Sequence, residues 1–414
     1  MPTPLTVDAE LAAQEEDRFS RLRLIPWWDQ EKIAAAHVLV IGAGALGNEI
    51  LKNLALLGFV HVVVMDMDRI ETSNLARSVL FRASDVGRSK AEAVALRYRD
   101  ILPEATVRPI VGNVMQDCGL GLFLWADLVL AGLDNREARL WINRAAWKTG
   151  RPWIDGAIEG VNGLARVFLP EKPPCYECTL GEADWAILNR RMSCNLLLQE
   201  ADPQGHVPTT PTISSIIAGI QVQEAVKALH DLPTLAGKAY IFEGVHHTSY
   251  VVEYTENPDC MSHATLEKIV QLPQASEELT LEDLARRGRK DLQADEVVIE
   301  FSRDVIHRLD CPRCGVQEEV FAPVGSIDRA HGLCPHCAQE GSEQQMRVVQ
   351  TLTGYRGEPE LSHRTLNRLG LPLFDLFTVR SADNEIGYCI AGDDSVVVGP
   401  ETEVDTVRSE EVQP

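Results

Sequence analysis

The chain has 414 residues, enough for two or three domains with cores of their own. Its 61 acidic and 39 basic residues give a net charge of −22, which argues against general binding of nucleic acid and against binding to anionic lipid. A nucleotide site remains compatible with this charge, because backbone N–H groups and a few cations are sufficient to bind phosphate.

The sequence carries no sign of a membrane or export segment. No apolar run reaches the roughly 18 to 20 residues that span a bilayer. Residues 1–17 are acidic and lack the apolar centre of a signal peptide. We therefore expect a cytoplasmic protein without a membrane partner, in which residues 1–17 form a partly helical arm.

Apolar runs and helical periodicities alternate through the first 158 residues. This pattern predicts strands at 37–42, 61–66, 106–114, 126–134 and 151–158, and helices at 47–58, 89–102 and 135–150. Strands that alternate with helices indicate a doubly wound, mostly parallel, Rossmann-like sheet. Strand patterns continue at 163–169, 238–244 and 248–254, which we expect to extend the sheet as antiparallel strands, and a strongly apolar helix is expected at 211–230.

The remaining segments are less regular. Residues 175–210 show weak periodicity, which predicts a long crossing segment of a kind that is often functional. From about residue 264 the chain is charged and favours helix, and strand patterns follow at 296–301, 373–381 and 386–392. We expect a small C-terminal α+β region at 264–398, with a zinc ribbon at 305–340, and a disordered acidic tail at 399–414.

A glycine-rich turn lies between the first predicted strand and helix. Gly42, Gly44 and Gly47 allow a tight turn, and the N-terminus of the following helix offers free N–H groups to phosphate. Asp66 ends the second strand, where an acid can bind the hydroxyl groups of a ribose. The alternative is a turn that only packs a helix on a strand, but the strand, turn, helix and acid together indicate a nucleotide site.

Polar residues beyond this turn indicate which chemistry follows. Hydride transfer needs only the turn and the acid, whereas Asn74, Arg77 and Lys90 suit the polarisation of a triphosphate. Asp134 follows a predicted strand, and a carboxylate there can hold Mg²⁺. Taken singly, the two cations could be solvated surface charges and Asp134 a helix N-cap. Their combination favours adenylation, in which a carboxylate attacks the α-phosphorus of ATP.

This part of the chain resembles the E1-like adenylyltransferases, the group of ThiF, MoeB and HesA and of the adenylation domains of ubiquitin-activating enzymes. The resemblance covers roughly residues 15–263, and we expect an ATP-binding adenylation domain at 18–263. It depends on RFSR (18–21), GAGALG (42–47), DMD (66–68), SNLAR (73–77), DVGRSK (85–90), LDN (133–135), CYEC (175–178) and PTTPTISSIIAGIQVQEAVK (208–227).

The resemblance implies a role for individual positions. Asp66 would hold the ribose of ATP, and Asp134 would hold the magnesium. The phosphates would be bound by Asn74, Arg77 and Lys90. Arg21 would reach into the site of a partner subunit, since family members are dimers or pseudo-dimers, and we expect a homodimer. Two departures are Ser78, where the family usually has glutamine, and Leu133, where threonine is commoner.

Eight cysteine and histidine positions suggest two metal sites. Cys-x-x-Cys pairs with 19 residues between them are typical of a zinc ribbon, the alternative being redox or free thiols. The ribbon ligands would be Cys311, Cys314, Cys334 and Cys337. A second site needs partners for Cys175 and Cys178, and the candidates are Cys260 and His263. Both zinc ions would be structural, because four protein ligands leave no open position.

Cys194 lies in the crossing segment, shortly after Arg190 and Arg191. Nearby cations lower the pKa of a thiol and favour the thiolate. Many relatives in the family it resembles place a nucleophilic cysteine in this segment, so Cys194 is the candidate nucleophile. The alternative is an ordinary half-buried cysteine. Cys118 and Cys389 lack such surroundings and are expected in the core.

The resemblance implies ATP-dependent adenylation of the C-terminal glycine of a ubiquitin-like protein, followed by a thioester on Cys194 for transfer to an E2-like enzyme. An alternative is MoeB- or ThiF-type activation of a sulfur-carrier protein. A NAD-dependent oxidoreductase and a nucleotide-binding scaffold without turnover represent other classes. The C-terminal region could recruit the modifier or the conjugating enzyme, or serve stability or dimerisation.

Overall fold

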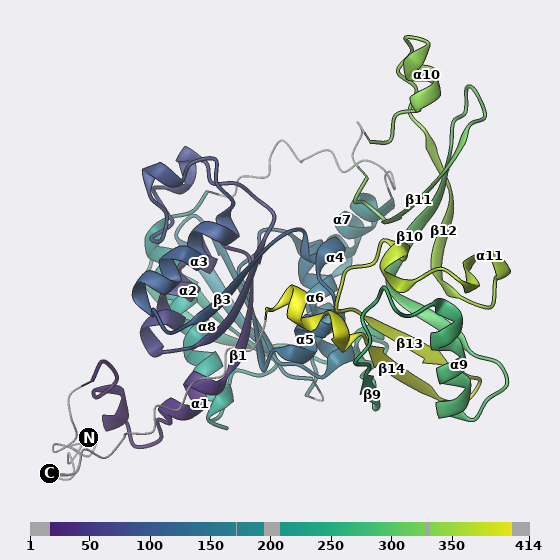
Figure 1. Cartoon of the computed structure of the whole chain (residues 1–414). Helices are drawn as coiled ribbons and strands as arrows, with labels where there is room; N and C mark the ends of the chain where they lie inside the picture. Colours follow the sequence, from purple (N-terminus) through teal and green to yellow (C-terminus); the bar gives the residue numbers. More distant parts are fainter. Residues whose placement is uncertain (1–16, 171, 194–207, 328–330, 400–414) are drawn as a thin grey trace, which may run out of the picture.

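The structure, a computed structural model, describes residues 17–170, 172–193, 208–327 and 331–399. Two sheets dominate it, one of eight strands in the N-terminal part and one of six strands in the C-terminal part (Figure 1). None of the helices in these described ranges combines the length and apolar character needed to span a bilayer.

The eight-stranded sheet has the order β3-β2-β1-β4-β5-β6-β7-β8. Its strands are β1 His37–Ile41, β2 His61–Asp66, β3 Thr106–Val111, β4 Leu128–Ala131, β5 Trp153–Glu159, β6 Asn162–Phe168, β7 Lys238–Glu243 and β8 Thr248–Glu253. The first five strands in this order, β3, β2, β1, β4 and β5, pair in parallel. The other three, β6, β7 and β8, extend the sheet as antiparallel strands. The predicted doubly wound, mostly parallel sheet with antiparallel strands is confirmed.

Helices cover both faces of this sheet. One layer consists of α2 Ala45–Leu57, α3 Lys90–Ile101 and α8 Pro211–Leu229, with α1 Gln30–Ala35 at its edge. The other consists of α4 Val114–Asp117, α5 Gly121–Trp125 and α6 Arg136–Thr149. Alternate strand residues enter the two cores: Val38 and Val40 face the first layer, and Leu39 and Ile41 the second.

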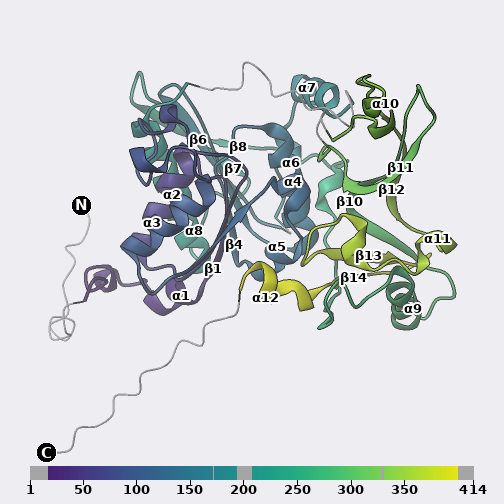
Figure 2. The ribbon, with the colours of Figure 1, turned by 45° about the horizontal axis from the view of Figure 1, so that its top comes forward.

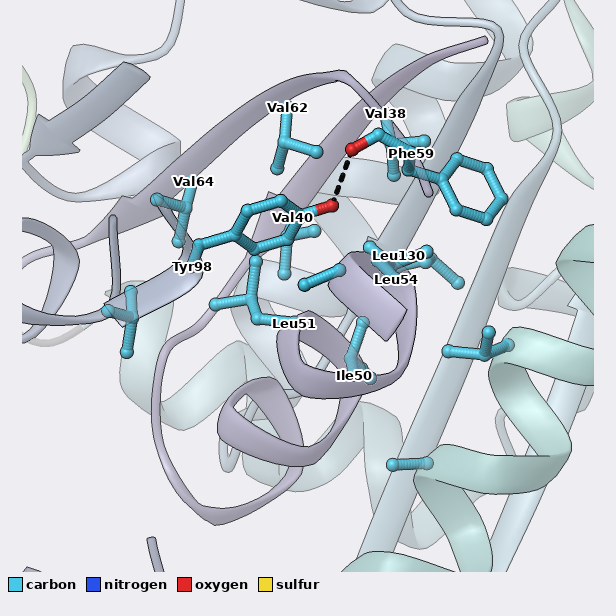
Figure 3. Packing of buried hydrophobic residues seen from close by; sticks show 14 of the residues in the cluster. Val38, Val40, Ile50, Leu51, Leu54, Phe59, Val62, Val64, Tyr98 and Leu130 are labelled. Atoms are coloured by element: carbon cyan, nitrogen blue, oxygen red, sulfur yellow. Dashed lines mark hydrogen bonds between the residues drawn. The ribbon is translucent and has the colours of Figure 1, made fainter. Parts of the chain in front are cut away.

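Figure 3 shows the first of these cores. Tyr98 of α3 lies among valines of β1 and β2, and its hydroxyl donates a hydrogen bond to the carbonyl of Phe59 at 2.7 Å. This partner satisfies the one polar atom that the ring brings into the core.

The C-terminal sheet has the order β11-β10-β13-β14-β9, with β12 also paired to β10. Its strands are β9 Ile269–Gln271, β10 Val298–Asp310, β11 Gln317–Pro323, β12 Arg347–Tyr355, β13 Leu376–Arg380 and β14 Glu385–Cys389. The helices of the C-terminal region are α9 Leu281–Leu292, α10 Pro335–Gln339, α11 Pro359–Ser362 and α12 Asp394–Val397.

Short 3₁₀ turns occur throughout the described residues. They are Leu22–Leu24, Thr72–Asn74, Ala83–Asp85, Glu177–Thr179, Met261–His263, Leu366–Leu369 and Ala391–Asp393.

The two sheets share a core through α4, α5 and α6, which lie between them in both views (Figures 1 and 2). Phe374 and Leu376 pack with Phe123 of α5 in one cluster. The guanidinium of Arg303 donates to the carbonyls of Met115 and Cys118, the first at 2.9 Å. The C-terminal region is therefore held firmly on this helical layer. Cys118 and Cys389 are fully buried in the shared core, as predicted.

Three local predictions need correction. The helical preference assigned to 265–291 holds only in α9, which begins at Leu281 behind a Thr280 capping box, while Ile269–Gln271 is a strand. The strand predicted at 296–301 is the start of the much longer β10, because β13 pairs with its beginning and β11 and β12 with its second half. The crossing segment contains a helix, α7 Glu182–Ser193.

Candidate functional site

The glycine turn joins β1 to α2 and packs tightly against β4. Gly42 has a φ of 96°, and a Cβ added there would lie 2.5 Å from the carbonyl oxygen of Gly132. A Cβ on Gly47 would lie 1.9 Å from the carbonyl oxygen of Gly42. Gly44 has open space instead: in the part of the chain that the structure describes, no atom beyond its own neighbours lies within 4 Å of such a Cβ, and no side chain caps the start of α2. The turn therefore offers uncapped N–H groups and room for a phosphate.

Asp66 lies at the end of β2, beside this turn. Its carboxylate accepts hydrogen bonds from the backbone N–H of Ala43 at 2.7 Å and of Asp68 at 2.8 Å. Burial raises the pKa of Asp66, and the two backbone donors and Lys90 oppose that shift. The carboxylate is thus fixed at the edge of the cleft, where a ribose hydroxyl could donate to it.

One cleft of about 1280 Å³ brings together most of the predicted nucleotide residues. Those that line it are Gly42, Gly44, Asp66, Asn74, Arg77, Lys90 and Asp134. Gly47 lies behind the turn, outside the lining. These residues come from five different segments of the first 135 positions, and parallel strands carry their ends to the same edge of the sheet.

The cationic side of the cleft has two different environments. The ammonium of Lys90 lies 2.8 Å from a carboxylate oxygen of Asp68, and its side chain is 12% exposed. The half-buried Arg77 side chain forms no hydrogen bond or ion pair with the residues that the structure describes. Asn74 is buried, and its side-chain oxygen accepts from the backbone N–H of Glu71 at 2.9 Å. Arg77 is therefore available to an anionic ligand without breaking an existing pair.

Asp134 lies on the turn between β4 and α6 and is exposed to the cleft. The N-cap of α6 is its neighbour Asn135, whose side chain accepts from the backbone N–H of Ala138 at 2.7 Å. The alternative reading of Asp134 as a helix cap is thus wrong. Among the residues that the structure describes, its carboxylate has one weak contact, with the Asn135 amide at 3.4 Å, and none of them occupies it as an ion-pair partner, so a cation could bind there.

A buried ionic cluster, which no sequence motif had indicated, also borders the cleft. Asp155 of β5 is fully buried between the guanidinium groups of Arg139 on α6 and Arg166 on β6. Arg166 lies over the ring of Tyr176, 4.8 Å from its centroid. The sequence did contain a signal for this cluster. Asp155 and Arg166 each interrupt an apolar strand pattern, and a charge buried in a strand needs a partner of opposite charge.

Arg21 lies elsewhere in the chain. It is exposed near the start of the described residues and lies outside the cleft lining, on a segment whose Phe19 packs against the first core and whose Arg18 donates to the carbonyl of Ile101 at 2.8 Å. A single copy of the chain therefore does not bring Arg21 to its own site.

Both predicted metal clusters are assembled, as groups whose ligand atoms lie within 4.8 Å of one another. In the first, Cys175 Sγ lies 3.5 Å from Cys260 Sγ, and Cys178 Sγ lies 3.3 Å from His263 Nε2. In the ribbon, the pairs Cys311 with Cys337 and Cys314 with Cys334 are 3.7 and 3.6 Å apart. A tetrahedral zinc with Zn–S bonds of about 2.3 Å separates its sulfurs by about 3.8 Å, so both clusters fit a metal.

The first cluster also has the surroundings of a metal site. The second ring nitrogen of His263 lies 3.9 Å from a carboxylate oxygen of Glu256, beyond hydrogen-bond distance, and a carboxylate is the kind of group that orients a ligating imidazole. His263, predicted as the fourth ligand, thus lies within the cluster.

Cys194 lies outside the described residues. The helix before it, α7, is fixed at its start by an ion pair of Asp184 with Arg136 at 3.1 Å, and both residues line the cleft. Trp185 and Leu188 of α7 pack into the core shared with α6. Part of the crossing segment is therefore a docked helix beside the cleft.

Comparison with known proteins decides the family. The model of the ThiF family matches residues 17–262, more than half of the chain. The chain belongs to the ThiF family. The resemblance to E1-like adenylyltransferases is thereby confirmed, and the fold around the cleft is the one that such proteins share.

Curated relatives of this ThiF-family chain include activating enzymes. It is 31% identical over 260 residues to the SAMP-activating enzyme E1 of Haloferax volcanii, covering 60% of this chain and 89% of that protein. It is 43% identical over 151 residues to the NEDD8-activating enzyme E1 catalytic subunit of Schizosaccharomyces pombe, covering 35% of this chain and 34% of that one. The chain thus spans about a third of the length of the NEDD8-activating relatives that it matches.

Among solved structures, Escherichia coli MccB with ATP has the same fold. It has a TM-score of 0.51 and 21% identity, over 62% of this chain and 76% of MccB. This ThiF-family fold therefore accounts for the N-terminal sheet, whereas residues 263–414 lie beyond the family match.

Proposed function

We propose that this ThiF-family protein uses ATP to adenylate the C-terminal glycine of a ubiquitin-like protein. The observation that carries the proposal is the single cleft that joins an uncapped glycine turn, a ribose-type acid, two cations and a free carboxylate. The names of the relatives, which include enzymes that activate NEDD8 and SAMP, support the choice of substrate. Residues 18–263 would be the catalytic unit and 264–398 an appended region.

The reaction joins two anions. A carboxylate oxygen of the tail attacks the α-phosphorus of ATP, the bond from that phosphorus to the bridging oxygen breaks, and pyrophosphate leaves. Arg77 and Lys90 would bind the phosphates and offset the repulsion between the reactants. Magnesium, held by Asp134, would neutralise the charge on the leaving phosphates. No general base is needed, because the attacking carboxylate is already ionised.

The far end of the cleft provides room for the tail. Asn162 and Gly163 of β6, Phe242 of β7 and the following Val245 line it beyond the nucleotide residues. ATP–pyrophosphate exchange tests the proposal, with a ubiquitin-like protein ending in glycine as the second substrate. We expect exchange only when that glycine is present. Exchange that is equal with a tail lacking the glycine, or absent with every such protein, would contradict adenylation.

We further propose that Cys194 takes the modifier from the adenylate as a thioester and passes it to an E2-like enzyme. Cys194→Ala is expected to keep ATP–pyrophosphate exchange and to lose the covalent adduct, since the thiol acts only after the adenylate has formed. Mass spectrometry of the enzyme after incubation with ATP and modifier measures the adduct, and a reducing agent should remove it. An enzyme that forms no adduct but supports loading of the modifier with sulfide would instead be an activator of a sulfur-carrier protein.

Two structural zinc ions complete the proposal, one in each cluster. Both offer four protein ligands, so neither zinc would have a position for substrate. Cysteine pairs that bind zinc rather than form disulfides are typical of a reducing compartment, which supports a cytoplasmic protein.

A second copy of the chain is the proposed partner at the outer layer of helices. Leu56 of α2 is 53% exposed, and Leu96 of α3 and Ile216 of α8 are also exposed on this layer. The opposite layer is already covered by the C-terminal sheet. In such a homodimer, Arg21 of one copy would enter the cleft of the other.

Subunit mixing tests this arrangement. Arg21→Ala and Lys90→Ala are each expected to lose exchange activity, and an equimolar mixture should recover about a quarter of the wild-type rate, because half of the dimers would carry one intact site. The mixture is allowed to exchange subunits before exchange of pyrophosphate is measured. A mixture as inactive as its components would show that Arg21 does not act across an interface.

A further inference from the structure

We propose that Arg139 is a positioning residue, which holds the turn that carries Asp134 so that this carboxylate faces the cleft. The inference rests on the proposed adenylation, and it assigns a task to the buried ionic cluster behind the cleft. Asp134 is exposed and makes one weak side-chain contact within the described ranges, so its position is set by the backbone on which it lies.

The contacts of Arg139 bracket Asp134. Its Nη2 donates to the carbonyl of Leu133 at 2.5 Å, and its Nη1 donates to the carbonyl of Asn135 at 3.3 Å. The carbonyls of both residues that flank Asp134 are thus bonded to one guanidinium. The side chain of Arg139 is 7% exposed, so these hydrogen bonds are shielded from water, which does not compete for the two carbonyls.

The same guanidinium is anchored from behind. Its Nε donates to Asp155 at 2.8 Å, and Nη2 also donates to the carbonyl of Gly156 at 3.0 Å. Pairing of β4 with β5 ends at Ala131 and Asp155, so the Gly156 carbonyl has no β4 partner and takes the arginine instead. Arg139 therefore connects the turn after β4 to β5, which lies in the rigid centre of the sheet.

The planar shape of the side chain is essential to this task. Four hydrogen bonds leave the guanidinium in different directions, toward three carbonyls and one carboxylate. A lysine ammonium carries the same charge but is a compact point on a flexible stem, and it cannot reach these acceptors together. Arg139→Lys thus keeps the charge of the cluster and removes the fixed geometry.

Magnesium dependence is the direct test. We expect Arg139→Lys to raise the half-saturating Mg²⁺ concentration for ATP–pyrophosphate exchange by about 10- to 100-fold, the usual cost of losing a group that orients a metal ligand. In EDTA, the variant should bind a fluorescent ATP analogue about as tightly as the wild type does. Mg²⁺ should strengthen this binding in the wild type but not in the variant. Arg139→Gln, which leaves one arginine–aspartate pair in the cluster, serves the same test if the lysine variant does not fold.

A double variant separates positioning from a general loss of stability. If Arg139 acts through Asp134, adding Arg139→Lys to Asp134→Asn should cost nothing more, whereas independent effects multiply. Arg151→Lys is the matched control, because Arg151 also donates to a backbone carbonyl, that of Leu124 at 2.7 Å, but lies outside the cleft lining. Multiplied losses, or an unchanged Mg²⁺ requirement in folded Arg139→Lys, would overturn the proposal.

The outcome for Arg139 is distinguishable from failure of the proposed function. A wild-type protein that binds the ATP analogue but shows no exchange would contradict adenylation. The strengthening of nucleotide binding by Mg²⁺ would then still decide whether Arg139 supports Asp134, since that measurement requires no turnover.

Discussion

Replacing Lys90 with alanine is expected to reduce ATP–pyrophosphate exchange by about 10²- to 10³-fold, the range found when one preorganised group that stabilises charge is removed. Lys90 is placed by the start of α3, and its ammonium enters the cleft where the phosphates would lie. Its present partner, Asp68, is about half exposed, so the substitution leaves no buried charge without a partner. The loss should therefore appear in the rate and hardly in the unfolding temperature.

Lys32→Ala is the matched control for that experiment. Lys32 of α1 also pairs with an exposed carboxylate, that of Asp231 at 3.5 Å, but it lies outside the cleft lining. We expect near wild-type exchange from this variant. Equal losses from the two substitutions, or full activity of Lys90→Ala, would remove the phosphate-binding role on which the proposed function depends.

The nucleotide part of the cleft was predictable because its signals are local. The turn at Gly42, the acid at Asp66 and the strand ends follow from periodicity and glycine spacing, and a parallel sheet gathers them at one edge. The long strand β10 was not predictable in the same way. Its second half, from Val305, is held by pairing with both β11 and β12, which is information that a window of neighbouring residues does not contain.

The supporting residues behind the cleft could not be predicted from the sequence for a related reason. Arg139 and Asp155 are 16 positions apart, on a helix and a strand, and either could be a surface charge when its own segment is considered alone. Their role becomes visible only in the folded structure, where both residues are buried against each other. In the same way, the sequence alone left Asp134 as a possible helix cap, and only the hydrogen bond that the N–H of Ala138 donates to Asn135 assigns that task to its neighbour.

The metal clusters allow the second prediction with a large expected effect, because each ties together a different part of the molecule. The ribbon ligands lie at the end of the arm formed by β10, β11 and β12, and no ribbon ligand lines the cleft. Around them the described core is small, with Ile306, Leu309, Ile327 and Met346 as its main apolar members. So small a core depends on its metal, and structural zinc binding contributes roughly 10–16 kcal/mol in comparable small modules.

Replacing Cys334 and Cys337 together with serine is expected to lower the zinc content from two ions to one per chain, as measured by elemental analysis of the purified protein. The arm should become sensitive to protease, while ATP–pyrophosphate exchange continues. The described contacts at its base lie beside α4, far from the ribbon ligands: Arg303 donates to the carbonyls of Met115 and Cys118, and Gln116 donates to the carbonyl of Gly325 at 2.6 Å. Cys118→Ser, at a buried thiol outside both clusters, should retain both ions.

Cys178→Ser provides the contrast. It also removes one zinc ion, but its cluster is continuous with Tyr176, Thr179 and Leu180, which line the cleft. We therefore expect exchange activity to fall with this variant and to survive in the ribbon variant. Retention of two zinc ions by either variant would refute the metal assignment, and equal effects on exchange would show that the arm and the cleft are coupled more closely than their contacts indicate.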